Sequence, residues 1–183
     1  AEWPLEHVVK VLCFCHPADD AAMWEDQLAT LSRIFAAARR NRLELLVEVI
    51  PSKVGPVDDA TTAAAIARIY DAGIFPDWWK LEPFRTEAAW QAACAAIEER
   101  DPRVRGIVVL GLDAPAEELA ASFALAARQP LVKGFAVGRT IFGEAARAWM
   151  ADAMDDASAI AAMTERYRAL CETWDRARKG ETP

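Results

Sequence analysis

The chain has 183 residues, a formal net charge of −7 and hydrophobic residues at 54% of its positions. This length fits one domain, and the apolar content is enough for a substantial core. An acidic surface repels phosphate backbones, which excludes nucleic acid as an expected partner. No apolar run approaches the roughly 20 residues that span a bilayer. Residues 1–4 have neither a basic start nor an apolar signal core, so we expect a cytoplasmic protein with no membrane partner.

The cysteine and histidine content argues against a zinc site. The four cysteines lie among apolar neighbours with no C-x-x-C pair, which predicts buried, reduced thiols at Cys13, Cys15, Cys94 and Cys171. The two histidines, His7 and His16, have no other ligand at helical spacing. We therefore expect no metal and no cofactor, although carboxylates leave a magnesium site open as an alternative.

Apolar strand-like runs alternate with amphipathic helical patterns along the whole chain. A strand at 7–15 precedes a helix that opens at 17–20, and a strand at 43–51 precedes a helix over 58–73. A third strand at 77–83 is followed by a helix from 86, and a fourth at 106–112 by a helix from 113–115. A fifth strand at 132–137 precedes a short helix after 143 and a long one over about 158–178.

Five βα units in strict alternation predict an α/β fold with a parallel sheet. Two closures fit this pattern: an open doubly wound sheet, or an arc of a (β/α)₈ barrel. The first strand is not followed by the G-x-G-x-x-G turn of a dinucleotide-binding fold. A full barrel typically needs about 250 residues, so this chain is about three units short of one. We expect residues 1–183 to be the C-terminal part of a longer polypeptide.

Polar and glycine residues follow the apolar stem of each predicted strand. Function collects at these carboxyl ends in parallel α/β folds. In chain order the candidates are His16; Glu48, Ser52 and Lys53; Lys80 and Glu82; Gly111 and Asp113; and Gly138, Arg139 and Thr140.

Lys80 and Glu48 are the strongest candidates. Strand periodicity places Glu48 opposite Val47 and Val49, and it places Lys80 on the same face as Glu82. If these faces point into a barrel, Glu48 and Lys80 meet on neighbouring strands. One interpretation is a Schiff-base lysine beside a carboxylate that moves protons. The other is a buried ion pair that holds the sheet in register.

Residues 133–140, with the sequence KGFAVGRT, have the composition of an anion site. Glycine allows the backbone to approach a phosphate, Arg139 can form paired hydrogen bonds, and Thr140 adds a hydroxyl. The alternative is a tight turn with Arg139 in a surface ion pair. Lys53 lies on a loop and is either a ligand for a substrate carboxylate or a solvated lysine. Trp90, Trp149 and Trp174 have helical spacing and are predicted to pack in the core.

Several segments together resemble the aldolase-like domain at the C-terminal side of bacterial 5-dehydro-2-deoxygluconokinases of myo-inositol catabolism. They are EHVVK, FCHP, LVEVIP, PDWWKLEP, VVLGLD and KGFAVGRTIF, and the resemblance covers nearly the whole chain. The pattern is more distantly similar to tagatose 1,6-bisphosphate aldolase. By this resemblance Lys80 forms the imine, Glu48 is its acid/base partner, and Gly138 with Arg139 binds phosphate. From their places after the strands, we also expect Gly111, Asp113, Thr140 and Lys53 to bind the substrate or its phosphate.

The resemblance implies a metal-independent aldolase, an aldehyde-lyase of carbohydrate metabolism. The implied reaction cleaves 6-phospho-5-dehydro-2-deoxygluconate into dihydroxyacetone phosphate and malonate semialdehyde. No GAGD-like phosphoryl-transfer motif occurs, so any kinase activity belongs outside this segment. One alternative is a non-catalytic domain that binds a sugar phosphate or oligomerises. Another is a magnesium-dependent barrel lyase with Glu48, Glu82 and Asp113 as ligands. The open edges of a five-strand arc predict a homo-oligomer or complementation by the missing N-terminal part.

Overall fold

The computed structural model describes residues 3–112 and 114–181. The strands are β1 (Val8–Cys13), β2 (Glu44–Val49), β3 (Trp78–Leu81), β4 (Gly106–Leu110) and β5 (Val132–Ala136). The helices are α1 (Ala21–Arg40), α2 (Thr61–Asp71), α3 (Glu87–Glu98), α4 (Ala116–Ala126), α5 (Arg139–Met150) and α6 (Asp156–Lys179), with a short 3₁₀ turn, η1 (Pro51–Lys53), after β2.

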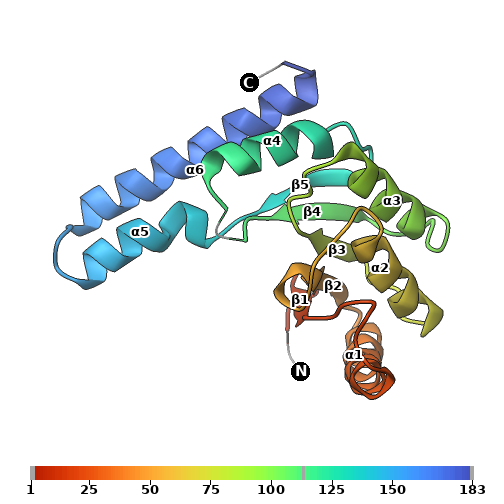
Figure 1. Cartoon of the computed structure of the whole chain (residues 1–183). Helices are drawn as coiled ribbons and strands as arrows, with labels where there is room; N and C mark the ends of the chain where they lie inside the picture. The colour runs from red at the N-terminus through yellow and green to blue at the C-terminus, as the bar shows by residue number, and fades with distance from the viewer. Residues whose placement is uncertain (1–2, 113, 182–183) are drawn as a thin grey trace.

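The five strands form one parallel sheet in the order β1-β2-β3-β4-β5. A doubly wound sheet reverses its strand order at a switch point, whereas a barrel adds each strand beside the one before it. Helices α1 to α4 follow one side of the curved sheet, α5 extends away from it, and α6 returns antiparallel to α5 and lies alongside α4 (Figure 1). The prediction of five units of a (β/α)₈ barrel is therefore confirmed.

The alternation of side chains in β2 and β3 divides the sheet into two chemically different faces. Val47, Val49 and Trp79 are fully buried in the core beneath the helices. Glu48 and Lys80 occupy the intervening positions and therefore point to the opposite, concave face. Their strands pair in register, with Glu48 directly opposite Lys80. The sheet thus isolates the two charged side chains from its hydrophobic core.

Trp79 is a central contact between the sheet and α2. Its side chain is fully buried, and its Nε1 donates a hydrogen bond of 2.9 Å to the Tyr70 hydroxyl. We expect Trp79→Ala to lower the free energy of unfolding by about 3–5 kcal/mol, because it leaves a cavity and an unpaired hydroxyl. Urea unfolding measures this loss. Trp149→Ala is the matched control at a site that is 49% exposed, and it should cost about 1 kcal/mol or less. Equal costs would contradict the assignment of Trp79 to the core.

Two local predictions about the C-terminal region are wrong. The helix expected after residue 143 begins earlier, at Arg139, so that Gly143 lies inside α5. Trp149 was expected in the core, but it is half exposed, and Ala145 is the one buried residue of α5. Helical spacing alone does not reveal whether another element covers an apolar side chain. Trp90 and Trp174 are buried as predicted.

The thiols behave as core groups. Cys13, Cys15 and Cys94 are buried, and Cys171 is half buried. Burial raises the pKa of Cys13 to about 11 and the pKa values of Cys15 and Cys94 to about 12. These three thiols stay protonated near neutral pH and are unsuited to nucleophilic attack. Within the described ranges, no helix is both long and apolar enough to cross a membrane.

Candidate functional site

A pocket of about 330 Å³ lies at the carboxyl ends of the strands. Seven of the eight predicted site residues line it: Glu48, Lys53, Lys80, Gly111, Gly138, Arg139 and Thr140. The eighth, Asp113, lies outside the described residues. The pocket wall is completed by apolar side chains and by one further cation, Lys10. Residues from β1, β2, β3 and the ends of β4 and β5 therefore meet in one place.

A carboxylate between two ammonium groups forms the centre of this pocket. Lys80 Nζ lies 3.3 Å from Glu48 Oε1, and Lys10 Nζ forms an ion pair with Glu48 Oε2. The Glu48 side chain is only 7% exposed, compared with 19% for Lys80 and 45% for Lys10. The Glu48 carboxylate can therefore exchange protons with a ligand that is bound at the Lys80 amine. Lys10, the more exposed of the two lysines, adds positive charge on the solvent side of Glu48.

Lys10 is the site residue that the sequence analysis missed. It occupies an alternate position of β1, between Val8 and Leu12 on the concave face. Leu12 is the direct partner of Glu48, so Lys10 reaches the carboxylate diagonally across the strand pair. A charged residue inside the run VVKVL was the available signal, but its partner depends on the register between β1 and β2.

The last three residues of the predicted anion site at 133–140 form the N-cap and the start of α5. Gly138 is the N-cap of α5, and Arg139 and Thr140 are its first two residues. A helix N-terminus presents backbone N–H groups and a positive dipole end to an anion. Thr140 Oγ1 is buried and has no hydrogen-bond partner in the described part of the chain. A Cβ on Gly111 would lie 2.8 Å from Val137 Cγ1, so glycine allows the end of β4 to pack against this turn.

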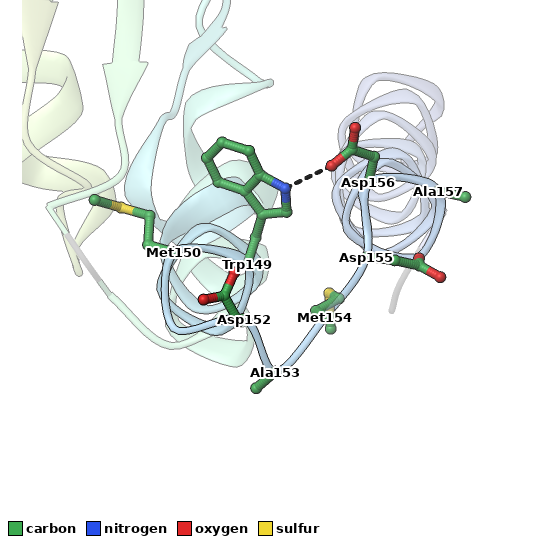
Figure 2. A pocket seen from close by; sticks show the side chains of 8 residues that line it. All are labelled: Trp149, Met150, Asp152, Ala153, Met154, Asp155, Asp156 and Ala157. Atoms are coloured by element: carbon green, nitrogen blue, oxygen red, sulfur yellow. Dashed lines mark hydrogen bonds between the residues drawn. The ribbon is translucent and has the colours of Figure 1, made fainter.

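The charge of the pocket is opposite to the charge of the chain. Four basic side chains and one carboxylate line it: Lys10, Lys53, Lys80, Arg139 and Glu48. A larger hollow of about 1060 Å³ lies at the turn between α5 and α6. Figure 2 shows that Trp149 reaches across this hollow to Asp156, and its lining contains three aspartates and no basic residue. The chemistry of an anionic ligand therefore favours the smaller pocket.

Glu82 lies outside the pocket that contains Lys80. Strand periodicity had placed the two side chains on the same face of the sheet. Glu82 follows the end of β3, is buried, and accepts a hydrogen bond from Ser52 Oγ. Its carboxyl lines a neighbouring cavity of about 540 Å³. No cluster of three potential metal ligands among His, Cys, Asp and Glu occurs in residues 3–112 and 114–181. Glu48 and Glu82 thus line different cavities, which disfavours the magnesium site proposed from them.

Burial raises the pKa of Glu82 above its usual range, and the hydrogen bonds from Ser52 oppose this shift. The charged groups that line the same cavity are Asp58, Asp59, Arg85 and Glu118. Because the folded pKa exceeds the unfolded pKa, the stabilisation is present at low pH and is lost as pH rises through the folded value. We expect Glu82→Gln, which does not titrate, to become more stable relative to wild type as the pH rises above the ordinary glutamate pKa of 4.5. Urea unfolding at several pH values above this pKa measures it, and a constant or falling difference would contradict the shift.

The fold is similar to a known aldolase structure. Fructose-bisphosphate aldolase from Plasmodium falciparum, solved in a ternary complex with TRAP and a small-molecule inhibitor, superimposes with a TM-score of 0.64 at 15% sequence identity. The match covers 97% of this chain and 57% of that chain. At this identity the likeness establishes the aldolase-like fold alone. This chain corresponds to a little over half of the aldolase barrel protein.

No curated protein matches the chain. A family match covers residues 1–178, which is nearly the full length. The chain therefore belongs to the family described as "Uncharacterized protein conserved in bacteria (DUF2090)".

Proposed function

We propose that this chain carries the imine-forming site of a class I aldolase that acts on a phosphorylated keto acid. The observation that carries the proposal is the Lys80–Glu48 pair, at 3.3 Å, inside a cationic pocket of an acidic protein. The aldolase-like fold supports it. The resemblance of PDWWKLEP and KGFAVGRT to the inositol-catabolism domain supports 6-phospho-5-dehydro-2-deoxygluconate as the substrate.

In this mechanism the Lys80 amine adds to the substrate ketone, and loss of water gives an iminium ion. Glu48 removes the proton from the hydroxyl that lies two carbons from the iminium carbon. The bond between this hydroxyl carbon and the carbon next to the iminium carbon breaks, and the hydroxyl carbon becomes an aldehyde. The electron pair of the broken bond moves into the iminium to give an enamine. The aldehyde product is malonate semialdehyde. Protonation of the enamine carbon and hydrolysis then release dihydroxyacetone phosphate and regenerate Lys80.

The other pocket residues serve binding in this proposal. The first turn of α5, with Gly138, Arg139 and Thr140, holds the phosphate. Lys53 lies on the turn after β2 and faces the carboxylate end of the substrate. Lys10 forms an ion pair with Glu48 and adds positive charge to the pocket. A pocket of about 330 Å³ lies at the lower end of the range for small-molecule sites.

The openness of the half-barrel favours a second candidate function, a non-catalytic domain that binds sugar phosphates. Lys10 is 45% exposed, and the fold match covers only 57% of the aldolase chain. In the described part of the chain, β1 pairs with β2 alone and β5 with β4 alone. Further strands or a second copy beside these edges would close the pocket.

Borohydride trapping distinguishes the two functions. The protein is incubated with dihydroxyacetone phosphate and sodium borohydride, and the site of any adduct is located by peptide mass spectrometry. If Lys80 forms an imine, hydride reduction leaves a stable secondary amine on Lys80, with the mass of the ligand less water plus two hydrogens. An unmodified Lys80 in protein that still binds dihydroxyacetone phosphate would overturn the aldolase and favour the binding domain.

A further inference from the structure

Hydrogen bonds hold the turn that carries Lys53 from two sides. The two partner residues, Glu82 and His16, lie outside the pocket. On the β3 side, the Glu82 carboxylate accepts from Ser52 Oγ and, at 3.4 Å, from the Ser52 backbone N–H. Ser52 is the middle residue of η1, and Lys53 is its last. The Glu82 contact therefore fixes the residue directly before Lys53.

On the β1 side, His16 holds the continuation of the same turn. The backbone N–H of Ala18 donates to His16 Nδ1 at 3.1 Å, so the other ring nitrogen, Nε2, carries the proton. Nε2 lies 2.9 Å from the Pro56 carbonyl and donates to it. The ring also packs against Gly55, where an added Cβ would lie 3.5 Å from it. Residues 52–56 are thus held between His16, after β1, and Glu82, after β3, and Lys53 within them lines the pocket.

Lys53 is an exposed side chain that nevertheless lines the pocket. Binding through a lysine on a mobile loop costs both backbone and side-chain entropy. A backbone that is already fixed removes the backbone part of this cost. The first turn of α5 supplies a second cationic group, Arg139, from the end of β5. Lys53 on η1 and Arg139 on α5 therefore add positive charge to the pocket from two elements that follow different strands, in addition to Lys10 and Lys80.

We propose that Glu82 is a positioning residue: through Ser52 it places the Lys53 ammonium at the pocket mouth, where Lys53 selects ligands that carry a carboxylate in addition to a phosphate. This inference rests on the proposed function for the phosphate end of the pocket. It goes further in assigning the positioning of Lys53 to Glu82, a buried residue outside the pocket.

The test uses two unreactive ligands that differ in one group, 6-phosphogluconate and glucitol 6-phosphate. Only the first has a carboxylate, and neither needs imine chemistry to bind. Isothermal titration of the protein should show about two- to fivefold tighter binding of 6-phosphogluconate, the range expected for one exposed ion pair. Lys53→Ala, Ser52→Ala and Glu82→Ala should each abolish this preference, because they weaken the binding of 6-phosphogluconate more than the binding of glucitol 6-phosphate. Glu82→Gln, which keeps an acceptor for Ser52, should retain the preference.

A double variant separates positioning from general stability. If Glu82 acts through Lys53, Glu82→Ala adds no further loss of preference to Lys53→Ala. Ser52→Ala removes the hydrogen bond from the Ser52 hydroxyl to Glu82 and changes only an exposed residue. It therefore tests the positioning role of Glu82 even if Glu82→Ala fails to fold. A preference retained in Ser52→Ala would overturn the role of Glu82. Equal affinities of the wild type for the two ligands would overturn the role of Lys53, and borohydride trapping at Lys80 would show independently whether the aldolase proposal survives.

Discussion

Lys80→Arg should abolish the covalent trapping of dihydroxyacetone phosphate by borohydride and reduce aldol cleavage to the background rate. Arginine keeps the positive charge next to Glu48, but its guanidinium stays protonated and cannot add to a ketone. The variant therefore removes the nucleophile and preserves the ion pair. Peptide mass spectrometry measures trapping, and a coupled assay of dihydroxyacetone phosphate measures cleavage.

The matched control is Lys133→Arg, which makes the same chemical change outside the pocket. Lys133 lies on β5, is exposed, and donates to the Pro130 carbonyl at 2.8 Å. This control should keep full trapping and cleavage. Urea unfolding of both variants checks that the fold is intact. An adduct that forms at normal yield in Lys80→Arg would place the imine on another lysine, and Lys10 and Lys53 would then be the candidates within the pocket.

The sequence was sufficient to place the central pair because strand periodicity is a local property. Alternation in β2 sends Val47 and Val49 to the core and Glu48 to the concave face, and β3 does the same with Trp79 and Lys80. The pairing of Glu48 with Lys80 required one further assumption, that consecutive strands are neighbours. The observed strand order satisfies it.

Contacts that depend on register or on loop geometry were not predictable in the same way. Lys10 meets Glu48 only because β1 pairs with β2 at one particular offset. The Ser52–Glu82 hydrogen bond joins two strand ends that are 30 residues apart in the sequence. The start of α5 at Arg139 was misplaced because the low helix propensity of Gly143 was taken as a boundary. In the structure α5 begins at Arg139, with Gly138 as its N-cap, and continues through Gly143.

Glu48→Gln should reduce aldol cleavage by about 10²–10⁴-fold, the range for loss of a general base, and should leave imine formation detectable. The amide is nearly the same size as the carboxylate and still accepts a hydrogen bond from Lys80. It cannot take the proton from the substrate hydroxyl. Borohydride trapping of dihydroxyacetone phosphate at Lys80 should therefore persist in this variant, and the rate of cleavage should fall.

The same variant decides between the two interpretations of the buried pair. If the pair served only to hold the sheet in register, Glu48→Gln would weaken the contacts to Lys80 and Lys10 and lower stability, with no selective loss of cleavage. If Glu48 moves protons, the cleavage rate falls far more than any fall in stability explains. The substitution also leaves Lys10 and Lys80 on either side of a neutral amide, so Lys10→Met in the same chain should recover part of the lost stability. It should recover none of the lost cleavage, because removing a repulsive charge does not restore a base.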